Sequence, residues 1–122
     1  MKKTIAMTLV LVMALAIVFT GCGQTEEKSD LPKIGIIQYV EHPSLDTIRE
    51  NIIAELADQG YVDGETATII YKNGQGDTNN LKTISQSLEA EDCDVIIAIA
   101  TPAAQAAAKI KDTPIIFAAI TD

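Results

Sequence analysis

Basic residues are scarce in this 122-residue chain: nine Lys and Arg stand against 17 Asp and Glu, and the formal net charge is −8. Aromatic residues make up only 4% of the sequence, and no Lys/Arg cluster is interleaved with them. Nucleic-acid binding needs a concentrated positive surface, because contacts with phosphates supply much of the affinity. The composition therefore argues against nucleic acid as a partner, and we interpret the acidity as a source of solubility.

Cysteine and histidine are equally scarce. The two cysteines form no disulfide framework, because we assign Cys22 to lipid attachment below and Cys93 is then left alone. Cys93 comes just before an apolar segment, so we expect an inert, partly buried thiol. His42 is the only histidine and has no local set of partner ligands, which favours a loop or ligand-lining role over catalysis or metal binding. We predict no catalytic residue, no metal and no cofactor.

Residues 1–21 have the pattern of a secretory signal peptide. Lys2 and Lys3 precede an apolar run over residues 5–19, and Phe19-Thr20-Gly21-Cys22 follows. This ending resembles the bacterial lipoprotein signal, in which the cysteine receives the lipid and becomes the new N-terminus. The resemblance implies lipidation of Cys22. A plain transmembrane anchor is the weaker interpretation, because the run is shorter than the ~20 residues that a spanning helix needs.

Residues 22–33 are expected to be the lipidated cysteine and a flexible tether. Residues 24–33 are polar and poor in hydrophobic side chains, which is typical of linkers. Two or more acyl chains hold a protein stably on a bilayer. We therefore expect a water-soluble body that is anchored by lipid to the cell membrane and faces away from the cytoplasm.

Residues 34–122 alternate between strand-like and helix-like patterns. Helical spacing of apolar residues is found from Leu45 to Leu56 and from Leu81 to Leu88, and an alanine-rich helix is expected over residues 102–110. The apolar segments expected to be strands are residues 34–40, 66–72, 94–100 and 114–120. Continuous apolar strands that alternate with helices indicate a parallel sheet covered on both faces. The sequence thus predicts an α/β fold with a doubly wound parallel sheet.

Two further expectations concern the ends of this sheet. The second strand has a more mixed pattern than the others, so it is expected near an edge. The last strand leads to Asp122 without a following helix, so we expect an incomplete unit.

Ligands of open parallel sheets bind outside the carboxyl ends of the strands, which makes four loops the candidate surface. Thr101-Pro102 carries the strongest signal, because Thr is a common N-cap and Pro a common first helical residue. The alanines that follow leave backbone N–H groups free to approach an anion such as a carboxylate. In residues 73–77 two glycines lack the rest of a phosphate-loop motif, so we expect a turn in which Asp77 caps the next helix.

An enzyme on a Rossmann-like or flavodoxin-like layer is one alternative. Glu41-His42-Pro43 occupies the place of the glycine-rich turn that binds nucleotides, and Glu41 alone is not the acidic cluster of a phosphoacceptor domain. Cys93 precedes its strand and so lies at the opposite end of the sheet from the loops, which argues against a cysteine hydrolase. A structural or adhesive surface lipoprotein is the second alternative.

The four loops resemble the successive loop motifs of one family. The motifs are Tyr39-Val40-Glu41-His42-Pro43, Asn73-Gly74-Gln75-Gly76-Asp77, Ala100-Thr101-Pro102-Ala103-Ala104-Gln105 and Phe117-Ala118-Ala119-Ile120-Thr121-Asp122. The family is the lipoprotein substrate-binding components of ABC importers, in the branch with tryptophan- and phenylalanine-binding members. The resemblance implies a type I periplasmic-binding-protein-like fold with two α/β lobes, of which residues 34–122 match part of the N-terminal lobe.

This resemblance implies capture of a small solute outside the cell for an ABC permease, without chemistry. An amino acid is the expected solute, with an aromatic one favoured, and each of its charges needs a partner when it is buried. We expect Thr101 and the amides of Ala103 and Ala104 at the carboxylate, Asp122 or else Glu41 at the ammonium, and Tyr39 and His42 at the side chain. The expected ligand-binding residues are Tyr39, Glu41, His42, Thr101, Ala103, Ala104, Thr121 and Asp122.

Overall fold

The computed structural model describes residues 30–121. The expected signal peptide, the lipidation site Cys22, most of the tether and Asp122 lie outside the described residues. Among residues 30–121, no helix is both long and apolar enough to cross a membrane.

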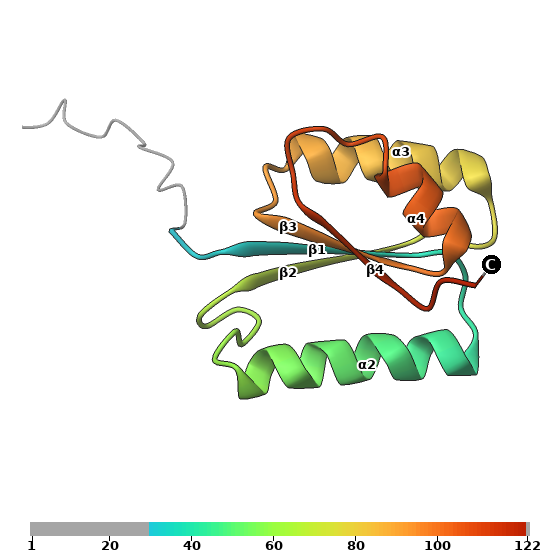
Figure 1. The fold of residues 1–122 in the computed structure, drawn as a ribbon. Coiled ribbons are helices and arrows are strands. Elements are labelled where there is room, and N and C mark those ends of the chain that lie inside the picture. Colours follow the sequence, from blue (N-terminus) through green and yellow to red (C-terminus); the bar gives the residue numbers. More distant parts are fainter. Residues whose placement is uncertain (1–29, 122) are drawn as a thin grey trace, which may run out of the picture. The chain divides into compact units, whose positions relative to one another are not determined.

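Four strands alternate with three helices along this part of the chain (Figure 1). They are β1 (Lys33–Gln38), α2 (Pro43–Asp58), β2 (Thr68–Asn73), α3 (Thr78–Ala90), β3 (Val95–Ile99), α4 (Thr101–Ala107) and β4 (Ile115–Ala118). Every expected strand and helix is present. β1, β3 and β4 end one or two residues earlier than predicted. After β3 and β4 the reason is a left-handed residue that turns the chain out of the sheet, Ala100 with φ +77° and Ala119 with φ +53°.

All strand pairs are parallel, and the strand order is β2-β1-β3-β4. Helices α3 and α4 cover one face of the sheet and α2 covers the other (Figure 1). The predicted α/β class and doubly wound parallel sheet are therefore confirmed. β2 lies at an edge, as its mixed pattern predicted.

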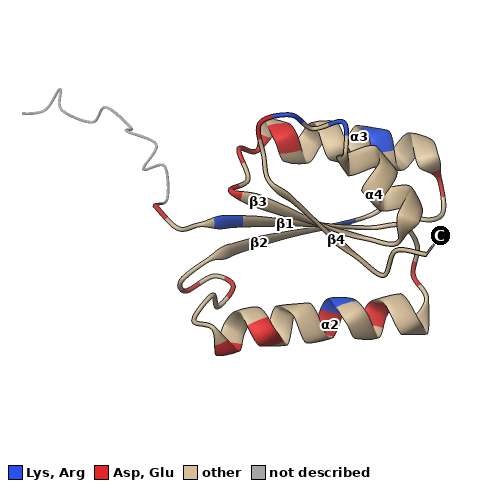
Figure 2. Cartoon of the chain, in the orientation of Figure 1, with Lys and Arg blue, Asp and Glu red and all other residues tan. Residues whose placement is uncertain are grey.

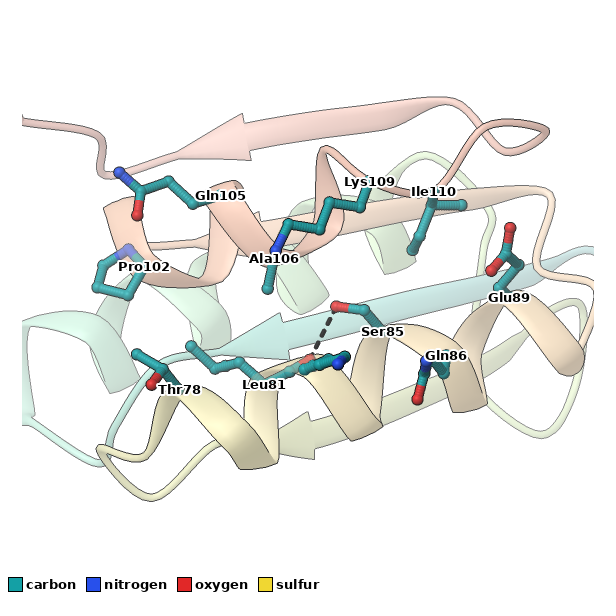
Figure 3. A pocket seen from close by; sticks show the side chains of 11 residues that line it. Thr78, Leu81, Ser85, Gln86, Glu89, Pro102, Gln105, Ala106, Lys109 and Ile110 are labelled. Atoms are coloured by element: carbon teal, nitrogen blue, oxygen red, sulfur yellow. Dashed lines mark hydrogen bonds between the residues drawn. The ribbon is translucent and has the colours of Figure 1, made fainter.

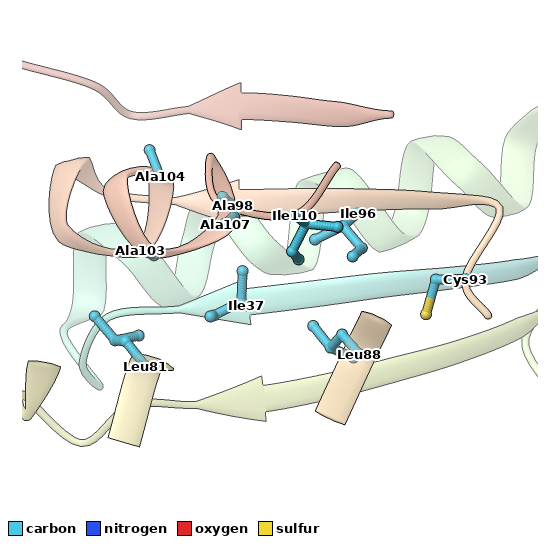
Figure 4. Packing of buried hydrophobic residues seen from close by; sticks show 10 residues of the cluster. All are labelled: Ile37, Leu81, Leu88, Cys93, Ile96, Ala98, Ala103, Ala104, Ala107 and Ile110. Atoms are coloured by element: carbon cyan, nitrogen blue, oxygen red, sulfur yellow. The ribbon is translucent and has the colours of Figure 1, made fainter. Parts of the chain in front are cut away.

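The face under α3 and α4 carries one hydrophobic cluster (Figure 4). Ile37 and Ile96 from the sheet meet Leu81 and Leu88 of α3, and the small side chains of α4 allow this helix to lie close to the strands. Cys93 is buried in the same cluster. Burial, together with the nearby carboxylate of Glu91, raises the pKa of its thiol, which agrees with the expected inert residue.

The opposite face is covered less completely. Ile34, Ile36 and Ile99 pack against the apolar side of α2, but α2 leaves Ile116 of the outer strand β4 half exposed. A groove of about 570 Å³ lies between α2 and β4, and Ile116 and Phe117 are 53% and 51% exposed. The edge of the sheet at β4 is therefore open and apolar.

We expect residues 23–122, expressed alone, to self-associate through this edge. An exposed strand with large apolar side chains is a template for pairing with another chain. Phe117→Lys should weaken association about tenfold, since it removes a half-exposed aromatic surface and adds a charge at the edge. Analytical ultracentrifugation over a concentration series measures the shift. Tyr61→Lys, at a position 43% exposed in the α2–β2 connection, is the matched control. A sharp, concentration-independent melt from a wild-type monomer contradicts the expectation.

Candidate functional site

The carboxyl ends of the four strands lie in register. Gln38 pairs with Asn73 on one side and Ile99 on the other, and Ile99 pairs with Ala118. All four strand-end loops therefore begin in one row, at the edge where open parallel sheets bind ligands. This edge of the sheet carries all four loops of the candidate surface.

The β1 loop (residues 39–42) and the β2 loop (residues 74–77) are bonded to each other. The Gly76 N–H donates to the Tyr39 carbonyl at 2.9 Å, and the Tyr39 hydroxyl donates to the Gly76 carbonyl at 3.1 Å. The Gly74 N–H donates to the Gln38 carbonyl at 2.8 Å. These bonds leave the Tyr39 ring between the two loops, with its hydroxyl already used.

Thr101 joins the loops that follow β3 and β4. Its hydroxyl donates to the Thr121 carbonyl and accepts from the Thr121 N–H, both at 3.2 Å. The expected N-cap role of Thr101 is wrong, because α4 begins one residue earlier, with Ala100 as the N-cap and no side-chain cap bond. The hydroxyl proton that we expected at a ligand carboxylate is donated to Thr121 instead.

The earlier helix start also changes which amides of α4 are free. The Ala104 N–H donates to the Ala100 carbonyl at 3.0 Å, so it is not available to a ligand, contrary to the expectation. The Ala103 N–H precedes it and belongs to the first turn, where N–H groups have no intrahelical acceptor. Ala103 is 0% exposed, side chain and backbone together, so its amide is covered in this arrangement of the loops.

His42 and Asp77 both cap helices. The Nδ1 of His42 accepts from the Ser44 N–H at 3.3 Å at the start of α2, which is the ordinary loop role that we favoured. Asp77 accepts from the Asn79 N–H at 2.7 Å at the start of α3, which confirms the predicted turn. Among residues 30–121, no three His, Cys, Asp or Glu side chains are grouped as a metal site requires.

Charge around these loops is negative or absent (Figure 2). Glu41 is exposed in the β1 loop, and residues 39–44, 73–77, 100–101 and 119–121 contain no Lys or Arg. On the described loops, a ligand carboxylate can therefore be bound only by amides and hydroxyls, whereas a cationic group can pair with Glu41.

Of the four non-glycine residues with positive φ in residues 30–121, three lie at the same edge, and the fourth, Asp92, precedes β3 at the other end of the sheet. Gln75, Ala100 and Ala119 have φ values of +56°, +77° and +53°, a region that residues with a Cβ rarely adopt. Each such residue costs of order 1–3 kcal/mol, and they persist where the surrounding structure holds them, often at ligand sites. The strain is consistent with loops that are held in place for binding.

A polar network that the sequence did not predict lies beneath the first two loops. We call it the Arg49 network; it consists of Gln38, Asp46, Arg49, Tyr71 and Asn73. A fully buried glutamine in an otherwise apolar strand was the signal that could have revealed it.

A groove of about 470 Å³ lies between α3 and α4 (Figure 3). Leu81 and Ala106 line it, Lys82 and Glu89 bring charges to it, and the Ser85 hydroxyl is used within α3, where it donates to the Leu81 carbonyl at 2.8 Å. Pro102 and Gln105 of the third loop motif line this groove from α4. None of the expected ligand-binding residues within residues 30–121 lines it, so the groove is not part of the candidate site.

Comparison with known proteins agrees with this geometry. Residues 33–122 match the family described as ABC transporter substrate binding protein. The chain is 38% identical to a tyrosine-binding protein of Clostridioides difficile, in an alignment that covers 99% of this chain and 38% of the relative. Substrate-binding proteins of ABC transporters act outside the cytoplasm, and they bind their substrates without transforming them.

Solved structures show the same relationship. A substrate-binding protein with adhesive properties from Clostridium difficile, in its ligand-free, open form, is 40% identical with a TM-score of 0.73, over 75% of this chain and 32% of that one. A Streptococcus pneumoniae ABC domain in complex with L-Trp is 45% identical with a TM-score of 0.72, over 75% and 31%. The chain thus spans about a third of the length of these relatives, and it belongs to the ABC transporter substrate-binding protein family.

Proposed function

We propose that this chain forms part of the N-terminal lobe of a lipid-anchored, extracytoplasmic binding protein that captures an amino acid for an ABC permease. The observation that carries the proposal is the row of four joined strand-end loops in a chain of this family. It is proposed to act by binding alone, since its relatives are substrate-binding proteins.

The proposed ligand class follows from the chemistry of the loops. An amino acid is a zwitterion, and a buried charge without a partner is costly. The Ala103 amide at the start of α4 is the proposed carboxylate donor on this lobe, and a ligand would reach it by displacing the residues that cover it. Asp122 or Glu41 is the proposed partner of the ammonium group. Tyr39 and His42 are proposed to lie beside the ligand side chain. We propose an aromatic amino acid because one relative is described as tyrosine-binding and another is in complex with L-Trp.

The two threonines have a different proposed role. Because the Thr101 hydroxyl is hydrogen-bonded to both the carbonyl and the N–H of Thr121, we propose that Thr101 holds Thr121 in place and does not donate to the ligand directly. This replaces the direct donor role that the sequence suggested.

Calorimetry with a panel of amino acids tests the proposal. Since the chain spans about a third of its relatives, we use a chimera in which residues 33–122 replace the matching segment of the C. difficile tyrosine-binding protein. Asp122→Ala should weaken binding by about 1.5–3 kcal/mol through loss of a charged hydrogen bond, and Thr101→Val by about 1 kcal/mol through loss of a neutral one.

Matched controls are Asp112→Ala in the exposed α4–β4 connection and Thr83→Val on the exposed side of α3. Unchanged affinity in both site variants refutes the placement of the ligand. If the unaltered chimera binds no amino acid, the ligand class is refuted as well.

Adhesion is a second candidate function. One relative is described as a substrate-binding protein with adhesive properties, so the two activities are combined in that protein. Attachment of cells that depends on this protein, without amino-acid binding by the chimera, would favour adhesion as the function of this chain.

A further inference from the structure

Gln38 is the innermost member of the Arg49 network. It is fully buried at the end of β1, on the face covered by α2. Its Nε2 donates at 2.8 Å to both the Val40 carbonyl and the Asp46 carboxylate, and its Oε1 accepts from Arg49 at 3.3 Å. Both protons and the oxygen of the amide are therefore used, and the Val40 carbonyl of the β1 loop has a fixed partner.

Arg49 connects α2 to the edge strand β2. The same terminal nitrogen donates to Asp46 at 3.0 Å and to the Tyr71 hydroxyl at 2.8 Å, and the guanidinium carbon lies 4.6 Å from the centre of the Tyr71 ring. Burial lowers the pKa of Arg49, but Tyr71, Asp46 and Glu50 together raise it above its ordinary value. Arg49 is therefore permanently charged, although its side chain is only 17% exposed.

Tyr71 and Asn73 carry the network to the β2 loop. The Tyr71 hydroxyl also accepts from Nδ2 of Asn73 at 3.0 Å. The Oδ1 of Asn73 accepts from the Gln75 N–H at 2.7 Å, and Gln75 is one of the strained, left-handed residues. The chain of hydrogen bonds thus runs from the Val40 carbonyl in one loop to the Gln75 amide in the next.

This arrangement is more polar than packing alone requires. Well-packed apolar residues often replace a buried ion pair with no loss of stability, so the network is weak evidence for a stabilising role. It does fix orientation, because planar guanidinium, carboxylate and amide groups bond only in defined directions. On the opposite face, Tyr39 and Gly76 bond the same two loops together.

We infer that Arg49 and Tyr71 are positioning residues: through Gln38 and Asn73 they hold the β1 and β2 loops in the single relative arrangement that ligand binding uses. The role of this arrangement in ligand binding rests on the proposed function. The rigidity of the loops does not.

Amide hydrogen exchange in the full chain tests the rigidity. Tyr71→Phe removes only the hydroxyl, so the Gln75 and Gly76 amides should exchange about tenfold faster, as expected for loss of one hydrogen bond near a charge. The amides of β3 should change no more than they do in Ile69→Val, a truncation near the start of β2 that lowers stability without touching the network. Tyr61→Phe, on an exposed tyrosine, is the control for the substitution itself.

Affinity of the chimera for L-tyrosine and L-tryptophan tests the purpose. Tyr71→Phe and Arg49→Lys should each weaken binding about three- to tenfold. Ile69→Val, which lowers stability without changing the network, should leave the affinity unchanged. If Arg49→Lys does not fold, Tyr71→Phe decides alone.

The outcomes separate the two proposals. Faster loop exchange in a protein that binds no amino acid supports the positioning of the loops and refutes the proposed ligand. If loop exchange and affinity change no more in Tyr71→Phe than in Ile69→Val, the inference is overturned, because the network would then act only on overall stability.

Discussion

Replacing Gly74 by alanine should lower the free energy of unfolding by about 3 kcal/mol, at the upper end of the cost of overpacking a core. A Cβ at this position would lie 2.5 Å and 2.8 Å from Cδ2 and Cγ of Leu81, and 3.0 Å from the Tyr39 carbonyl oxygen. Leu81 is only 1% exposed and packs in the cluster under α3 and α4, so it cannot swing into solvent. The backbone of the β2 loop has to move instead. Urea unfolding followed by circular dichroism measures the change.

Two comparisons separate the clash of the added Cβ with Leu81 from the other costs of replacing a glycine. Gly76 has φ +75°, but an added Cβ would meet nothing closer than 3.8 Å, so Gly76→Ala should cost about 1–2 kcal/mol from backbone strain alone. Leu81→Ala opens a cavity of its own, and Gly74→Ala should cost much less in that background because the Cβ then has room. An equal cost of Gly74→Ala in both backgrounds contradicts the clash as its cause.

The strands and helices were predictable because their signals are local. Three strands are nearly continuous apolar runs, and β2 is a more mixed one. Apolar periodicity located α2 and α3, and the alanine-rich composition located α4. The strand ends were less predictable, because alanine at positions 100 and 119 gives no local sign of a left-handed turn. Because the turn at Ala100 makes that residue the N-cap, α4 begins at Thr101, and the usual preference for threonine as N-cap does not apply there.

The surface that carries the site was predictable from topology, whereas its hydrogen bonds were not. Carboxyl ends of parallel strands meet at one edge in any such sheet, so the four loops followed from the strand pattern. The bond between Thr101 and Thr121, and the path from Gln38 through Arg49 to Tyr71, join residues 20 or more positions apart or on different elements. Only the packing of α2 on the sheet brings Arg49 to Tyr71, and no spacing rule contains that information.

Cys22→Ala should abolish incorporation of labelled palmitate completely. The proposed lipid is attached to this thiol, which lies at the end of the proposed signal peptide, and alanine offers no acceptor atom. Each buried methylene contributes about 0.8 kcal/mol to membrane binding, so loss of two or more chains removes the anchor altogether. The variant should therefore remain as unprocessed precursor or be shed into the medium, which immunoblots of membrane and medium fractions detect.

Cys93→Ala is the matched control, because Cys93 is the only other cysteine and is buried in the core of the domain. This variant should be labelled and retained on the membrane like the unaltered protein. Equal labelling of Cys22→Ala eliminates the proposed lipid anchor, and loss of label in Cys93→Ala alone would require that the thiol in the core be exposed before the domain folds. With the label dependent on Cys22 only, the same domain is placed outside the cytoplasm with its four loops free to meet a solute.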